Sequence, residues 1–174
     1  MDRPTLMNTA GWMALPIGIM WAASFLCTMY GTDRPSLSLL GTALAIISIF
    51  MLYRQLKNYR RLYPSSWLHI FRLSLLTCLL AGLLTDAAQY AYFVYLDNGR
   101  FFSIMRSQEY QQLFQQLFQQ VFPNLNPDET VKMLNEMSIR DIVMQMVINN
   151  IFLALPISLL AALPVREVKV KNEK

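Results

Sequence analysis

The chain has 174 residues, of which 55% are hydrophobic and 15% are charged, and its formal net charge is +4 at neutral pH. Soluble domains average about 25% charged residues, so this composition argues against an ordinary water-soluble protein. The positive charge does not indicate nucleic-acid binding either, because the basic residues are concentrated at the N-terminus, in one loop and in the C-terminal tail.

Four segments are apolar for long enough to cross a bilayer, which takes about 20 mostly apolar residues for roughly 30 Å of hydrocarbon. Three of these segments, 4–32, 35–53 and 142–165, carry no charge. The fourth, 73–96, carries a single acidic residue. One small soluble core could not bury four such uniformly apolar helices. We therefore predict an all-α integral membrane protein of one domain, residues 1–174, with four transmembrane helices at about 9–30, 36–53, 72–96 and 140–165.

The basic residues indicate the orientation of the chain, because Lys and Arg in short loops are held on the cytoplasmic side of a membrane. The loop between the second and third spans has basic residues and no acid, and the tail after Val165 is also mainly basic. We therefore predict that both termini are cytoplasmic. The same loop could meet anionic lipid headgroups, at about 1 kcal/mol per basic residue near the surface, but orientation alone is the favoured explanation of its charge.

Small residues recur at helical spacing on each span and predict the surfaces through which the helices pack. In lipid, small side chains mark contacts because they let two backbones approach closely. The four stripes are Ala14, Gly18 and Ala22; Ser38, Gly41, Ala45 and Ser48; Cys78, Gly82 and Asp86; and Asn150, Ala154, Ser158 and Ala162.

Asp86 is the acidic residue within the third span, about 21 Å along the helix from Arg72 and hence in the outer third of the bilayer. Two asparagines lie about 11 Å into the fourth span from the outer side, at a matching depth. Glutamines on both spans could join them. The candidate intramembrane polar cluster that we predict consists of Asp86, Gln89, Gln145, Asn149 and Asn150.

Two kinds of role fit this cluster. A carboxylate in hydrocarbon costs a few kcal/mol by insertion scales and is usually paired, protonated or hydrated. The functional hypothesis is a proton- or cation-binding site, or the polar floor of an outward-facing cavity. The structural hypothesis, which we favour, is that carboxyl and amide groups bond across helices and fix their register, or that tilt places Asp86 at a wetter depth.

The long outer loop contains an amphipathic segment at about 105–122, where a Gln-Gln-apolar-Phe unit occurs three times. Its apolar face consists of Leu113, Phe114, Leu117, Phe118, Val121 and Phe122, and glutamines occupy the opposite face. Because that polar face has no Lys or Arg, attraction to anionic lipid is not its basis. We expect this helix to lie in the outer headgroup region or over the mouth of the bundle; the alternative is a coiled-coil partner.

A second outer helix is predicted at about 127–137, because Asn126 suits an N-cap and Pro127 suits the first helical position. Ser138 with Asp141 repeats the capping pattern where the fourth span begins. We therefore expect the outer loop to be an ordered helical hairpin.

The order of these features resembles the bacterial membrane-protein family catalogued as domain of unknown function 4199. The resemblance rests on the glycines of the first span, the basic loop, a Ser-Ser-Trp entry to the third span, its aromatic outer end and a Pro-Asp-Glu helix: Gly11, Gly18, Tyr59, Ser65–Trp67, Tyr90–Asp97 and Pro127–Glu129. It implies a small multi-pass protein of the bacterial inner membrane with no assigned activity, and it supplies no catalytic residues.

Motifs of known enzymes are absent from the sequence: it contains no HExxH, CxxC, GxSxG, Walker or GxGxxG pattern. The single histidine, His69, lies among aromatic and apolar residues at the inner interface, where packing is the favoured role. A lone histidine without cysteines or acids at ligand spacing predicts no metal site. We expect no enzyme activity, no cofactor and no nucleic-acid partner.

Two functions of different classes follow from these features. The first, which we favour, is a non-catalytic accessory or structural membrane protein that assembles with itself or with a membrane-protein partner through the small-residue faces or the outer hairpin. The alternative is a small transporter or channel subunit that uses the region of Asp86 and Asn150. Four helices enclose little cavity, so transport would require a dimer.

Overall fold

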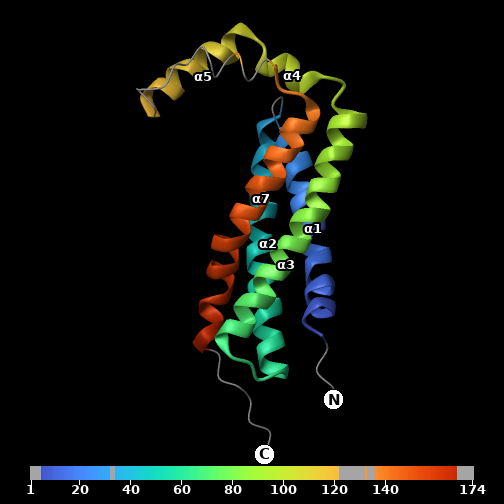
Figure 1. Cartoon of the computed structure of the whole chain (residues 1–174), viewed down its shortest axis with the longest axis vertical. Helices are drawn as coiled ribbons and strands as arrows, with labels where there is room; N and C mark the ends of the chain where they lie inside the picture. Colours follow the sequence, from blue (N-terminus) through green and yellow to red (C-terminus); the bar gives the residue numbers. More distant parts are fainter. Residues whose placement is uncertain (1–4, 32–33, 122–131, 133–135, 168–174) are drawn as a thin grey trace, which may run out of the picture. The chain divides into compact units, whose positions relative to one another are not determined.

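The computed structural model of this chain describes residues 5–31, 34–121, 132 and 136–167, and within these ranges every regular element is helical (Figure 1). The elements are α1 (Leu6–Tyr30), α2 (Pro35–Leu62), α3 (Trp67–Ala91), the π-helical turn η1 (Tyr92–Leu96), α4 (Arg100–Met105), α5 (Gln108–Val121), α7 (Ile139–Ala162) and the 3-10 turn η2 (Pro164–Glu167). The predicted all-α class with four membrane-length apolar helices is confirmed, and these are α1, α2, α3 with η1, and α7.

Local sequence explains where several helices begin. The Thr5 hydroxyl accepts a hydrogen bond from the Asn8 backbone at the start of α1, and Pro35 opens α2. At the start of α7, Ser138 Oγ donates to Asp141 Oδ2 at 2.6 Å and accepts from the Asp141 backbone N–H. The capping pattern predicted for this pair is therefore confirmed.

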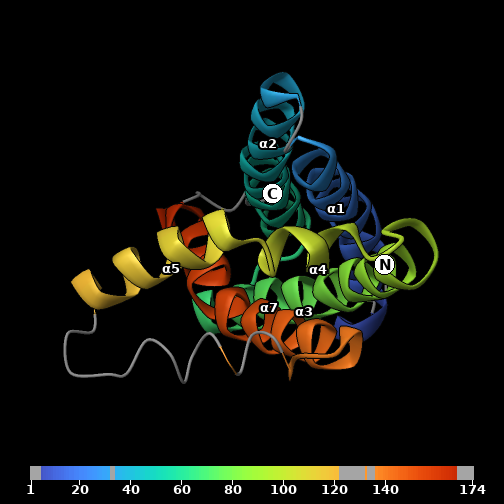
Figure 2. The same cartoon turned by 90° about the horizontal axis from the view of Figure 1, so that it is seen from above.

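The chain divides into two compact units, the first of residues 1–89 with 146–174 and the second of residues 90–145. In the first unit, α1, α2 and most of α3 and α7 run side by side as a helical bundle (Figures 1 and 2). In the second unit, Asp97 caps α4 by accepting from the Phe101 backbone N–H, and Gly99 takes a positive φ of 74° that suits glycine.

The predicted outer helices are described only in part. The helix predicted at about 105–122 corresponds to α5, which begins at Gln108 and ends at Val121, and a separate short helix, α4, ends at Met105. The predicted second outer helix, 127–137, falls almost entirely outside the described residues, as does Phe122. The hairpin therefore stays a prediction.

Burial in the bundle has the pattern expected of a protein in lipid. Large apolar side chains point outward, with exposed fractions of 75% for Trp12, 72% for Leu39 and 71% for Phe152. Small and polar side chains lie inside together with some large apolar ones, such as Ile17 and Leu52. Helix α3 is the most enclosed, because 44% of the residues in its most apolar stretch are buried, against 17–22% for the other three helices. Water would penalise so much exposed apolar surface, whereas hydrocarbon does not, so the chain is a multi-pass membrane protein.

Small residues lie at the helix contacts, as their spacing predicted. A Cβ added to Gly18 on α1 would lie 2.9 Å from the Leu84 Cβ of α3, and one added to Gly41 on α2 would lie 2.8 Å from the Ser24 carbonyl oxygen of α1. Members of all four predicted stripes are buried, namely Ala14, Gly18, Gly41, Ser48, Cys78, Gly82, Asp86, Ala154, Ser158 and Ala162. The bundle is therefore held by close backbone approach at these positions.

Candidate functional site

The polar side chains of α3 lie on its buried face. Ser74, Thr77, Thr85, Asp86 and Gln89 are all buried, although the helix is otherwise rich in leucine. The threonines satisfy their hydroxyls locally: Thr77 Oγ1 donates to the Leu73 carbonyl at 2.8 Å, and Thr85 Oγ1 donates to the Ala81 carbonyl at 2.9 Å. A carboxyl or a glutamine amide has more hydrogen-bonding groups than its own helix can satisfy, so Asp86 and Gln89 need partners from elsewhere.

Asp86 finds its partner on α7. Asn150 Nδ2 donates to Asp86 Oδ1 at 2.5 Å, and the Asp86 side chain is only 8% exposed. Gly82 lies one turn before Asp86, and a Cβ at that position would be 3.7 Å from the Asn150 Cβ. Gly82 therefore faces the same part of α7 as Asp86, and a Cβ at that position would make ordinary van der Waals contact with Asn150.

Gln89 lies three residues after Asp86 and is only 7% exposed. Its Oε1 atom is buried and has no hydrogen-bond partner among the described residues. A buried acceptor without a partner costs about 1–3 kcal/mol, so such a group in a native protein calls for an explanation such as an ordered water or a bound ion. Asp86 and Gln89 together place two oxygen-bearing side chains on one buried face of α3.

The other two predicted members, Asn149 and Gln145, lie at exposed positions. Asn149 is exposed on α7, next to the residue that bonds Asp86. Gln145 is also exposed and belongs to the second unit of the chain. Of the five residues predicted as a polar cluster, Asp86 and Asn150 are hydrogen-bonded to each other, and Gln89 is buried on the same face of α3 as Asp86.

Other hydrogen bonds between helices were missed from the sequence. Trp21 Nε1 donates to Ser48 Oγ at 2.7 Å, and Ser48 in turn donates to the Ala45 carbonyl. Ser24 Oγ donates to the Gly41 carbonyl at 2.7 Å. The spacing predicts Ser48 only as a small residue at a helix contact. Its hydroxyl also bonds, and the presence of serine rather than alanine in a stripe is the signal that could have shown this.

A further cross-helix bond, also missed from the sequence, joins α3 to α7 lower in the bundle, where Ser74 Oγ donates to the Ser158 carbonyl at 3.3 Å. Ser158 Oγ donates within its own helix to the Ala154 carbonyl. The α3–α7 contact therefore contains polar bonds at two levels, one at Ser74 and one at Asp86.

Polar contacts also join the helices near the α2–α3 connection. Tyr59 Oη and His69 Nε2 are 3.3 Å apart, and their rings stack with centroids 6.1 Å apart. Arg60 Nη1 donates to the Val165 carbonyl just after α7. The single histidine thus packs among aromatic groups, as predicted, and also has a hydrogen-bonding partner.

The amphipathic segment presents apolar side chains to the surface of its own unit. Leu113 and Leu117 are more than half exposed, and Tyr110 and Phe114 stack with ring centroids 6.5 Å apart. Phe114 is half-buried, and the side chains of Phe118, Val121 and Phe122 lie outside what the structure describes. No group of three metal-binding side chains gathers anywhere in the described ranges.

Comparison with known proteins agrees with the resemblance seen in the sequence. The chain matches the family described as "Protein of unknown function (DUF4199)" over residues 13–167, nearly its whole length, and it belongs to this family. No curated protein and no solved structure matches it.

Proposed function

We propose that this DUF4199 member is a non-catalytic accessory or structural protein of the bacterial inner membrane, with both termini in the cytoplasm. It acts by binding a second copy of itself or another membrane protein through its helix faces or its outer segment. The chain carries no motif of a known enzyme family.

The observation that carries this proposal is the use of the buried polar groups. The Asp86–Asn150, Trp21–Ser48 and Ser24–Gly41 hydrogen bonds each connect two helices of the bundle. Buried polar groups that form hydrogen bonds between helices fix the register of those helices and stabilise the bundle. A scaffold whose large apolar side chains point outward is suited to contacts with lipid and with other membrane helices.

The outer segment is the second part of the proposal. Leu113 and Leu117 on the apolar face of α5 are exposed within its unit, and its polar face is made of glutamines without Lys or Arg. We place this helix in the outer headgroup region or over the bundle mouth, where the apolar face is covered. Binding a partner helix is the alternative for the same face.

Crosslinking in native membranes followed by mass spectrometry tests the proposal. A photoreactive residue is introduced at Gln112 on α5 and, separately, at Phe152 on the exposed face of α7. We expect one dominant crosslinked partner, or the chain itself, from at least one position. Diffuse crosslinks to many abundant membrane proteins at both positions would contradict an accessory role.

A transporter or channel subunit is the alternative function, and Gln89 is the observation that favours it. Its unpartnered, buried Oε1 lies one turn from Asp86, so a water or a cation could complete the site. Protein in liposomes that moves protons or a cation, with flux abolished by Asp86→Asn, would support transport. Asn149→Ala is a suitable control, because Asn149 neighbours the site on α7 but is exposed. Silent liposomes combined with a captured partner would support the accessory role.

A further inference from the structure

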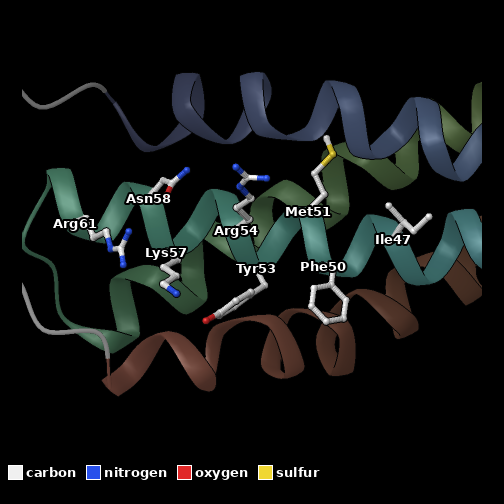
Figure 3. A pocket seen from close by; sticks show the side chains of 8 residues that line it. All are labelled: Ile47, Phe50, Met51, Tyr53, Arg54, Lys57, Asn58 and Arg61. Carbon is white, nitrogen blue, oxygen red and sulfur yellow. The ribbon is translucent and has the colours of Figure 1, made fainter.

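The outward side of α2 carries a groove of about 630 Å³ that is basic at one end and apolar at the other (Figure 3). Its lining side chains all come from α2: Ile47, Phe50, Met51, Tyr53, Arg54, Lys57, Asn58 and Arg61. Most of these positions recur at intervals of three or four residues, so they form one stripe along the helix. The three cations occupy the last part of the helix, from Arg54 onward, and the large apolar side chains Ile47, Phe50 and Met51 precede them.

The depth of this stripe matches the boundary between hydrocarbon and headgroups. The uncharged run from Pro35 to Tyr53 covers about 28 Å, which is close to the roughly 30 Å thickness of the hydrocarbon core. The helix then continues from Arg54 to Arg61, a further rise of about 10 Å. Its basic end therefore lies at the level of the lipid phosphates, and Phe50 and Met51 lie at the level of the acyl chains.

The basic side chains of the groove have no acidic neighbour on α1 or α2. Neither α1 nor α2 contains Asp or Glu, and the sequence has no acid between Asp33 and Asp86. Arg54 and Arg61 are exposed. Lys57 Nζ lies 5.6 Å from the centre of the Tyr53 ring, which holds the ammonium group beside the groove.

Arg60, the remaining basic residue of α2, does not line the groove. Its guanidinium is directed to the Val165 carbonyl, so it is used within the bundle. Arg54, Lys57 and Arg61 face outward on another side of the helix. Orientation of the chain requires only that basic residues be present in this loop, and it does not require them to share one face with an apolar groove.

We propose that this groove binds one anionic glycerophospholipid of the adjacent leaflet. The lipid phosphate lies among Arg54, Lys57 and Arg61, and an acyl chain runs along Ile47, Phe50 and Met51. Arg and Lys are the usual phosphate-binding side chains. The apolar end of the groove favours a lipid over a free anion, because it can hold an acyl chain. This site is independent of the accessory role proposed above.

Native mass spectrometry of the purified full chain in detergent tests the proposal. The protein is titrated with phosphatidylglycerol and with phosphatidylcholine of the same acyl chains. We expect phosphatidylglycerol to bind at least tenfold more tightly. Each basic residue near a membrane surface contributes about fivefold, so the triple variant Arg54→Gln, Lys57→Gln, Arg61→Gln is expected to lose at least tenfold in phosphatidylglycerol affinity and to bind phosphatidylcholine unchanged.

A charge-matched control separates a site from overall net charge. Replacing Lys169, Lys171 and Lys174 by Gln removes the same charge from the tail and is expected to keep the lipid preference. If the triple groove variant folds poorly, Arg54→Gln is compared with Arg72→Gln, which removes an exposed arginine from α3. An equal loss in the groove and control variants, or no loss in either, would overturn the proposal.

Inorganic phosphate provides the remaining comparison. Added alone at millimolar concentration, it is expected to give no adduct and not to displace phosphatidylglycerol. Phosphate adducts that disappear in the triple groove variant, without a preference among lipids, would assign the cations to a free anion and would overturn the lipid assignment.

Discussion

Asn150 on α7 donates a 2.5 Å hydrogen bond to the buried carboxyl group of Asp86 on α3. The pair therefore joins two transmembrane helices at a defined register. Its contribution to the stability of the bundle can be measured separately from any role in transport.

Removing one partner of this pair is expected to destabilise the bundle. Asn150→Ala leaves the Asp86 carboxyl group buried without its donor and should lower the free energy of unfolding by about 1–3 kcal/mol. Asn149→Ala, at the exposed neighbouring position, should lower it by less than Asn150→Ala does, because no buried carboxyl group loses its donor. Equilibrium unfolding in mixed micelles measures both. In a double-mutant cycle with Asp86→Ala, the coupling should be about 0.6 kcal/mol and not above roughly 1.7 kcal/mol; a coupling of zero would contradict the bond.

Gly18 and Gly11, both on α1, offer a matched test of close helix packing. A Cβ at Gly18 would lie 2.9 Å from the Leu84 Cβ and 3.0 Å from the Ala81 carbonyl oxygen, whereas a Cβ at Gly11 would meet nothing within 4 Å. Gly18→Ala should therefore destabilise the bundle by about 1–3 kcal/mol through overpacking. Gly11→Ala should be neutral or stabilise it by up to about 1 kcal/mol, because alanine is the better helix former. Equal effects of the two substitutions in the same unfolding assay would be inconsistent with the α1–α3 contact.

Ser48 is expected to be more than a small spacer, because it accepts the indole N–H of Trp21. Ser48→Ala leaves that N–H without its partner and should cost about 1–2 kcal/mol of stability. It should also shift the indole proton resonance of Trp21 in an NMR spectrum. Thr42→Val, which removes an exposed hydroxyl bonded within α2, should leave this resonance in place. An unmoved Trp21 signal in Ser48→Ala would mean that the bond does not form in the membrane.

Much of the bundle could be predicted because helical periodicity and depth are both readable from a sequence. Spacing placed Gly18, Gly41 and Ser158 at helix contacts, and counting 1.5 Å per residue brought Asp86 and Asn150 to one depth. Depth does not specify rotation about a helix axis. Successive residues are about 100° apart, so Asn149 and Asn150 share a depth while only Asn150 reaches Asp86.

Other features depend on details that a single sequence does not encode locally. The Trp21–Ser48 bond depends on how α1 and α2 are rotated against each other, and the π-helical turn from Tyr92 to Leu96 has no signal in residue type or spacing. The unpartnered Gln89 oxygen could not be predicted either, because a glutamine in a predicted span can occur with or without a hydrogen-bond partner.

The orientation of the chain leads to a prediction that labelling can test. In a background with Cys27 and Cys78 replaced by Ser, Gln112→Cys on α5 should react in intact cells with a maleimide that cannot cross the inner membrane. Asn172→Cys in the basic tail should react only after the membrane is opened, because the proposed orientation places the tail with its basic residues on the cytoplasmic side. The reverse pattern would place the termini outside, and labelling of both positions in intact cells would contradict an even number of spans. Because the lipid-binding groove on α2 lies at the same end of the bundle as the basic connection to α3, this experiment also assigns the leaflet that supplies the lipid.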